Sequence, residues 1–137
     1  MNKSFNHKIK VYYEDTDAGG VVYYANYLKF LERARSEAIA DIGFSNQKIK
    51  KDFGLLIIVK SCNLDFKKSA YLEDILKIKS SIISFSKTSL SMNQIIFKED
   101  DVIVNAKVHL VFINEKGKPN RIPEEIITKL KPYLSHS

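Results

Sequence analysis

The chain has 137 residues, 45% of them hydrophobic and 28% charged, which is the composition of one globular domain with a buried core and excludes a disordered chain. Its formal net charge of +6 favours anionic ligands, but the lysines are spread along the chain, and no nucleic-acid-binding motif is present. Without an apolar run of roughly 20 residues or a secretory signal, we expect a cytoplasmic domain covering residues 1–137, with no transmembrane segment and no nucleic-acid partner.

The first predicted elements are a strand and a long helix. Apolar and polar residues alternate over residues 5–13, the period of two that is typical of a half-buried strand. Over residues 24–42 apolar side chains recur every three or four positions, which predicts a helix with one face packed on a sheet. We expect Asn26 to cap the start of this helix and Gly43 to end it.

After Gly54 the sequence changes to β-branched and alternating stretches that predict a sheet. A short polar helix is expected before it and a closing helix after it, and the predicted elements are helix Ser45–Phe53, strands Leu55–Phe66, Asp74–Phe85, Thr88–Lys98 and Val102–Ile113, and helix Pro123–Tyr133. The strand connections are too short for parallel crossovers. The expected fold class is α+β, with one five-stranded antiparallel sheet curled around the long helix and open edges that favour dimerisation.

The segment YEDTDAGGVVYYANY, residues 13–27, combines the groups that acyl-transfer chemistry needs. Three carboxylates, Glu14, Asp15 and Asp17, follow the first strand, and a glycine pair then leads to the helix start. A helix start offers unpaired N–H groups that stabilise an oxyanion, and a nearby carboxylate can attack a carbonyl or activate water. From the residues alone, an ordinary glycine turn fits the same pattern.

This segment, followed by FLERARSE at residues 30–37, resembles the signature of the 4-hydroxybenzoyl-CoA thioesterase group of hotdog proteins, in particular the Tol–Pal-associated YbgC-type acyl-CoA thioesterases. The resemblance implies a hotdog fold that hydrolyses fatty acyl-CoA with water and no cofactor, coenzyme A being part of the substrate. It implies that Asp17 is the general base or nucleophile and that the N–H near Tyr24 polarises the thioester carbonyl. Relatives often have His in place of Tyr24, and a tyrosine hydroxyl is a poor base at neutral pH, so Asp17 is expected to work with backbone donors.

The resemblance also implies a substrate-binding set. The glycine turn would bring the acyl group between Asp17 and the helix start, tyrosines would line the acyl site, and a hairpin turn would meet the phosphates of coenzyme A. These residues are Gly19, Gly20, Val21, Tyr23, Tyr27, Lys87, Thr88 and Ser89. The implied partners are acyl-CoA and further copies of the chain in a homodimer or homotetramer. An acyl-carrier protein and a peripheral place at the inner membrane are further candidates.

The remaining candidates have structural interpretations. Cys62 has no activating neighbours and is interpreted as a packed thiol. The three histidines are dispersed without metal-ligand spacing, so no metal site is expected. Glu32 and Glu37 are expected to pair with Arg33 and Arg35 at a surface or interface. The alternative function is a hotdog module that binds acyl-CoA or an acyl-carrier protein without turnover, supported only by the tyrosine in the place of the histidine.

Overall fold

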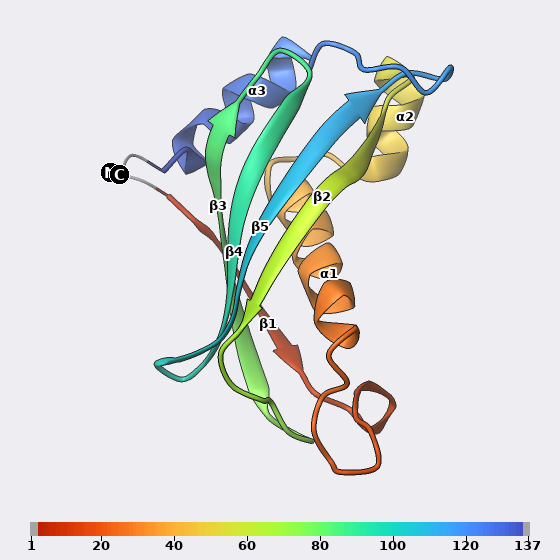
Figure 1. The fold of residues 1–137 in the computed structure, drawn as a ribbon. Coiled ribbons are helices and arrows are strands. Elements are labelled where there is room, and N and C mark those ends of the chain that lie inside the picture. The colour runs from red at the N-terminus through yellow and green to blue at the C-terminus, as the bar shows by residue number, and fades with distance from the viewer. Residues whose placement is uncertain (1–2, 136–137) are drawn as a thin grey trace.

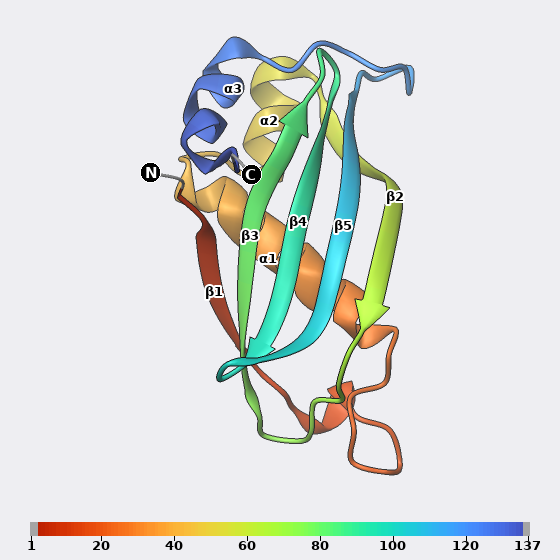
Figure 2. The ribbon, with the colours of Figure 1, turned by 60° about the vertical axis from the view of Figure 1, so that its left-hand side comes forward.

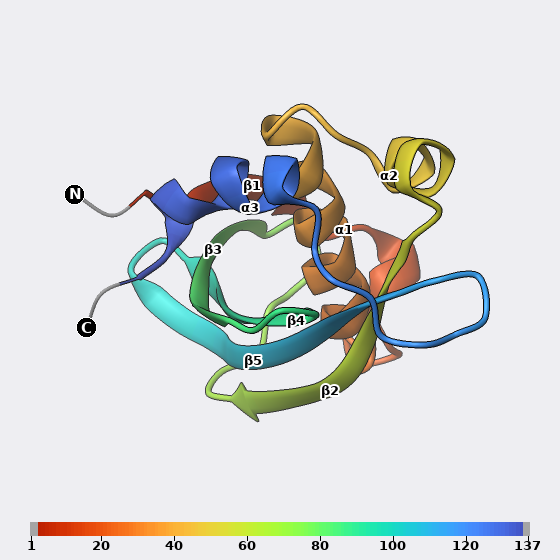
Figure 3. The same ribbon diagram turned by 90° about the horizontal axis from the view of Figure 1, so that it is seen from above.

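A five-stranded antiparallel sheet curls around one long helix in the computed structural model, which describes residues 3–135 (Figures 1 and 3). The strands are β1 (Phe5–Lys10), β2 (Leu56–Phe66), β3 (Ile75–Phe85), β4 (Ser89–Lys98) and β5 (Asp101–Ile113), in the order β1-β3-β4-β5-β2. The helices are α1 (Asn26–Asp41), α2 (Asn46–Phe53) and α3 (Glu124–Leu130), with short 3-10 turns at Tyr13–Asp15 and Lys131–Tyr133. The predicted α+β hotdog architecture is confirmed, and no helix among residues 3–135 is long and apolar enough to cross a membrane.

The core lies between α1 and the concave face of the sheet. One face of the long helix is buried, as its apolar periodicity predicts, although Leu28 is exposed. The buried residues of α1 are Tyr27, Phe30, Leu31, Ala34 and Ala38. The alternation in the last strand likewise turns one face inward, where Val104, Ala106, Val108, Leu110 and Phe112 are buried. The helix and the sheet bury their apolar faces against each other. The three- and four-residue periodicity of α1 and the alternation of β5 therefore mark the two faces that form the core.

The first strand is shorter than predicted. It ends at Lys10 because the chain turns away from the sheet edge into the 3-10 turn Tyr13–Asp15. The backbone N–H of Tyr12 donates to Oδ2 of Asp15 at 2.9 Å, a local bond that replaces a sheet hydrogen bond. The turn carries the following loop to one end of the molecule, as Figure 2 shows.

The predicted end of α1 is confirmed, but its predicted N-terminal cap is not. Gly43 has a φ of 89°, a left-handed conformation that suits glycine, and its N–H donates to the carbonyl of Ala40, so the predicted C-terminal stop is confirmed. The prediction that Asn26 caps the start is wrong. Asn26 is the first helical residue, and its Nδ2 donates instead to the carbonyl of Asp15 at 2.9 Å. The residue before it, Ala25, has no side chain that could cap the helix.

A polar network is buried inside this core. Gln94 is fully buried on β4, and its Nε2 donates to the carbonyl of Leu31 at 3.1 Å and to Oγ of Ser80 at 3.1 Å. Its Oε1 accepts from Nη1 of Arg35 at 3.0 Å. Gln94 on β4 therefore satisfies polar groups of both α1 and β3, and it fixes α1 over the middle of the sheet.

Replacing Gln94 by leucine should destabilise the protein by about 2–4 kcal/mol, since three groups lose their hydrogen-bond partner inside the core. Urea unfolding followed by circular dichroism measures this change. Gln47→Leu is the matched control, because Gln47 is an exposed glutamine on α2, and its substitution should change the free energy of unfolding by less than about 0.5 kcal/mol. Equal midpoints for the two variants would contradict a structural role for the network.

Candidate active site

The segment between β1 and α1 forms a small hairpin loop at the end of the sheet (Figures 1 and 2). Thr16 pairs with Val22 in an antiparallel bridge, and the N–H of Asp17 donates to the carbonyl of Val21 at 2.9 Å. Val21 also pairs with Tyr71, just ahead of β3. The loop is therefore tied to itself and to the sheet, and it holds Asp17 at its tip.

The two glycines of the loop meet different demands of its geometry. Gly20 has a φ of 79°, a conformation that other residues rarely adopt, and its N–H closes the turn on the carbonyl of Asp17 at 3.0 Å. A side chain on Gly19 would place its Cβ 3.3 Å from Oδ1 of Asp17. The backbone freedom predicted for this pair is therefore confirmed at Gly20, and Gly19 instead leaves space beside the Asp17 carboxylate.

The Asp17 side chain is exposed and incompletely paired. Its Oδ1 accepts a hydrogen bond from the N–H of Gly19 at 2.8 Å, which orients the carboxylate. Its Oδ2 has no hydrogen-bond partner within residues 3–135. This oxygen is free to accept a proton from water or to act as a nucleophile.

Asp15 braces the loop against the helix start. Its side chain is buried, and its carbonyl accepts from the N–H of Tyr23 at 3.0 Å and from Nδ2 of Asn26 at 2.9 Å. Its carboxylate accepts from Tyr12, as described above. Glu14, in contrast, is exposed. Of the two carboxylates beside Asp17 in this segment, Asp15 therefore positions the loop and Glu14 is solvated.

The start of α1 leaves backbone donors unused. The N–H of Asn26 donates to the carbonyl of Tyr23 at 2.8 Å, and Tyr27 and Leu28 make longer bonds of the same three-residue type. The N–H groups of Tyr24 and Ala25 have no acceptor in the part of the chain that the structure describes. Two free amides at the positive end of a helix, close to a carboxylate loop, are the donors that an oxyanion requires.

Aromatic side chains surround the helix start. Tyr23 and Tyr24 are exposed neighbours with ring centroids 5.0 Å apart, and the Tyr24 ring meets the edge of Phe66 at 6.2 Å. Phe66, at the end of β2, was not among the residues predicted for the site. A strand-end aromatic residue gives no sequence signal of its own, because only the fold brings it beside Tyr24.

Tyr27, which was predicted to line the acyl site, is buried in this chain. Its ring is buried between Phe30 and Phe66, and its hydroxyl accepts from the N–H of Ala70 at 3.0 Å. Burial raises the pKa of the Tyr27 hydroxyl, and the Ala70 hydrogen bond opposes this only in part. Tyr27 therefore anchors α1 to the segment before β3 from within the core.

The hairpin turn between β3 and β4, residues 86–88, lies at the opposite end of the molecule from the loop between β1 and α1 (Figure 1). The turn follows β3, whereas Val21 contacts the chain just before β3, and the 11 residues of this strand span roughly 35 Å. Ser89 is buried, and its Oγ lies 2.6 Å from Oγ of Ser86. One chain therefore does not bring Lys87, Thr88 and Ser89 together with Asp17.

Cys62 has a structural role, whereas the ion pairs expected for Glu32 and Glu37 are not formed within the described residues. Burial raises the pKa of the half-buried Cys62 thiol, an effect that Arg35 opposes, so the thiol is not activated as a nucleophile. No group of three metal-ligating side chains occurs within residues 3–135. No ion pair in the same range involves Glu32 or Glu37. The expected partner Arg35 turns inward to Gln94, because α1 presents it to the sheet.

Comparisons with known proteins agree with this geometry. A family model described as the Thioesterase-like superfamily matches residues 11–130. The acyl-CoA thioester hydrolase YbgC of Escherichia coli is 37% identical over 129 residues, covering 93% of this chain and 96% of that protein. The acyl-CoA thioesterase YbgC of Haemophilus influenzae is 32% identical over 127 residues, covering 92% of this chain and 93% of that protein.

Two solved structures also match this chain over most of its length. The crystal structure of a probable thioesterase from Bartonella henselae has a TM-score of 0.85 and 36% identity, covering 88% of this chain and 100% of that one. A hypothetical protein from Aquifex aeolicus has a TM-score of 0.87 and 28% identity, covering 93% of this chain and 99% of that one. The chain therefore belongs to the Thioesterase-like superfamily and is one of its hotdog thioesterases.

Proposed function

We propose that this protein is an acyl-CoA thioesterase that hydrolyses fatty acyl-CoA to the free acid and coenzyme A, with no cofactor. The observation that carries the proposal is that one short segment holds both a free helix-start amide, at Tyr24, and a free carboxylate oxygen, Oδ2 of Asp17. The YbgC proteins of two bacteria, to which the chain is similar over nearly its full length, are named as acyl-CoA thioesterases. The arrangement of the site and the similarity to the YbgC proteins therefore support the same reaction.

In the proposed reaction the carbonyl oxygen of the thioester accepts a hydrogen bond from the Tyr24 N–H. Asp17 then acts in one of two ways. As a general base it takes a proton from water, whose oxygen adds to the carbonyl carbon. As a nucleophile its carboxylate oxygen adds there itself, and water hydrolyses the resulting anhydride. In both routes the negative charge on the former carbonyl oxygen collapses to break the C–S bond, and the thiolate of coenzyme A leaves and is protonated.

We propose that a second copy of the chain completes the binding site for coenzyme A. Lys87 and Thr88 have side chains that suit phosphate groups, but the length of β3 separates them from the loop that holds Asp17 in their own chain. Strand β2 forms an open edge of the sheet and exposes Leu56, Ile58 and Val59. An apolar edge of this kind favours pairing with another copy. Such a homodimer could bring the turn of one chain near the loop of the other.

Release of free thiol from acyl-CoA substrates tests the proposed function directly. The wild-type protein should release thiol from long-chain acyl-CoA in buffer without added metal or cofactor, because the proposed reaction uses only side-chain and backbone groups. A thiol-reactive dye measures the rate for butanoyl-, octanoyl- and dodecanoyl-CoA. Saturable binding of dodecanoyl-CoA without any thiol release would contradict hydrolysis, and it would indicate the binding module described as the alternative function.

A further inference from the structure

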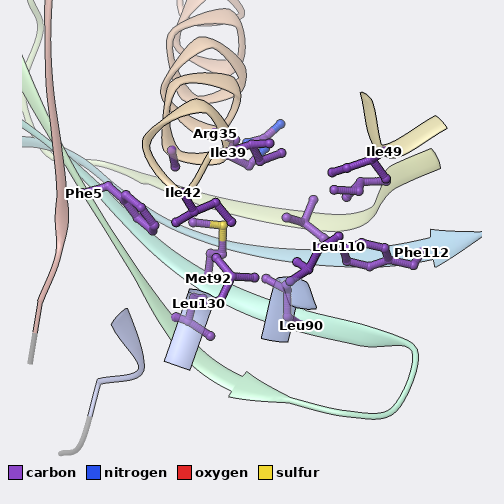
Figure 4. Close-up of a pocket in the computed structure, with 14 residues that line it drawn as sticks. Phe5, Arg35, Ile39, Ile42, Ile49, Leu90, Met92, Leu110, Phe112 and Leu130 are labelled. Carbon is purple, nitrogen blue, oxygen red and sulfur yellow. The ribbon is translucent and has the colours of Figure 1, made fainter. Parts of the chain in front are cut away.

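The two faces of the sheet differ in their chemistry. On the inner face, apolar side chains such as Leu90, Met92 and Leu110 point into a small cavity of about 40 Å³ beneath α1 (Figure 4). The outer face of β1, β3 and β4 instead carries lysine, serine and asparagine side chains. In Figure 2 this face is turned toward the viewer, and α1 lies behind the sheet. The molecule therefore has a second, polar surface that the core does not use.

Four lysines form a compact group on the outer face, here called the lysine group. Lys8 on β1 lies directly opposite Lys77 on β3. Lys10 and Lys79 occupy the two diagonal positions on the same face, because side chains two residues apart on a strand point the same way. All four are exposed, and none forms an ion pair within residues 3–135. Like charges that face each other across strands destabilise a sheet, so folding does not account for the group.

Protection of a sheet edge accounts for only half of the lysine group. Lysines on an edge strand discourage pairing with another chain, and β1 is an edge strand. Lys77 and Lys79 lie on β3, which is paired on both sides. Their charges are not neutralised nearby, since β1, β3 and β4 contain no acidic residue, and Asp74, just ahead of β3, is paired with Lys98 at 3.0 Å. The lysine group therefore indicates an anionic partner.

A hollow of about 270 Å³ adjoins the lysine group and shares Lys79 with it. Lys3 lines the same hollow, together with Ser4, Ser81 and Asn93, and no carboxylate lines it. Ser81 and Asn93 face each other across β3 and β4. Ammonium, hydroxyl and amide groups all donate hydrogen bonds, and phosphate oxygens accept them. The hollow therefore suits a phosphate group.

Apolar side chains lie among the lysines on the outer face. Ile75 is opposite Lys10, and Phe97 is opposite Lys77. Ile95 lines the hollow. Ile75 is 54% exposed, and Ile95 and Phe97 are half-buried. A small phosphate compound in solution offers nothing to these side chains, whereas a bilayer has an apolar boundary beneath its phosphates.

We propose that the outer face of β1, β3 and β4 docks the protein on a membrane surface that contains anionic phospholipids. The lysine group attracts the headgroup phosphates, and the hollow at Lys79 receives one of them. Charge complementarity selects this partner over a second copy of the chain, because two lysine groups facing each other would repel. The surface contains none of the residues of the Asp17 loop, so the docking does not depend on the proposed function.

Co-sedimentation with lipid vesicles tests the docking. The wild type should bind vesicles of phosphatidylcholine mixed with phosphatidylglycerol, bind pure phosphatidylcholine only weakly, and lose affinity as the salt concentration rises. Combining Lys77→Gln with Lys79→Gln should weaken binding roughly 25-fold, at about fivefold for each lysine. Combining Lys50→Gln with Lys51→Gln is the matched control, since it removes two exposed lysines from α2, on the other side of the sheet, and should bind like the wild type. Equal weakening in the two double variants would overturn the proposal.

Further measurements separate the membrane from other partners and from the reaction. Thermal unfolding and thiol release from butanoyl-CoA should be unchanged in the Lys77 and Lys79 double variant, since both lysines are exposed and lie outside the catalytic loop. Displacement of the wild type from vesicles by an equal concentration of free glycerol phosphate would show a site for a soluble compound and overturn the docking. Tighter binding to duplex DNA than to vesicles, with the same dependence on these lysines, would also overturn it. Vesicle binding without any thiol release would refute the proposed function and leave the docking standing.

Discussion

Asp17→Asn is expected to lower kcat for thiol release by roughly 10² to 10⁴-fold, the contribution of a positioned general base, with a smaller change in KM. The amide keeps an oxygen that accepts from the Gly19 N–H, so the turn should survive the substitution. What disappears is the capacity to take a proton from water or to attack the thioester. The carboxylate is exposed, so little folding stability depends on it. Steady-state kinetics and a thermal unfolding curve measure the two effects separately.

Glu14→Gln is the matched control for this substitution. Glu14 is a second exposed carboxylate in the same segment and accepts no hydrogen bond in the described part of the chain, so its loss should leave kcat unchanged. Equal turnover by wild type and Asp17→Asn would contradict the assignment of Asp17. A single turnover in oxygen-18 water tests the nucleophilic route. Label recovered in Asp17 indicates an anhydride that water opens at the Asp17 carboxyl carbon, whereas label found only in the released acid shows that water attacks the acyl carbon.

Most of the fold was predictable because its signals are local. The alternation in the last strand and the three- and four-residue steps of α1 each predict one face of the core, and both faces are buried in the structure. Turn chemistry also has a local cause, so Gly20 and Gly43 could be placed from residue type and position. The error at Asn26 shows the limit of such signals. The same side chain can cap its own helix or bind a distant carbonyl, and only the fold selects the second option.

The candidate site was predictable where its residues are contiguous in sequence. Asp17, the glycines and the Tyr24 amide lie within eight positions, and the structure places them in one loop that leads into α1. Groups contributed by other elements had no such signal. Gln94 holds Arg35 from a strand 59 residues away, and Phe66 reaches Tyr24 from the end of β2. Contacts of this kind depend on tertiary packing, which single-sequence patterns do not encode.

Tyr24 offers two groups to the reaction, its backbone N–H and its side-chain hydroxyl, and substitutions test them separately. Tyr24→Phe and Tyr24→Ala keep the N–H, so both should retain turnover if the backbone polarises the thioester. Tyr24→Pro removes this donor, and it should lower kcat by roughly 10² to 10³-fold relative to Tyr24→Ala. Proline is tolerated near helix starts, and the N–H of Tyr24 has no partner in the described structure, so little folding energy is lost with it.

Kinetics of the three Tyr24 variants, with thermal unfolding as the check on folding, decide between two chemistries. If the hydroxyl has replaced the histidine of relatives as an acid or orienting group, Tyr24→Phe should be as slow as Tyr24→Pro. If the amide carries the reaction, only proline should be slow, because phenylalanine and alanine leave the donor at the end of the helix dipole intact. The absence of an acceptor for this amide, beside a tyrosine ring that packs against Phe66, favours the second result. A Tyr24→Pro enzyme as fast as Tyr24→Ala would exclude the helix start as the oxyanion donor.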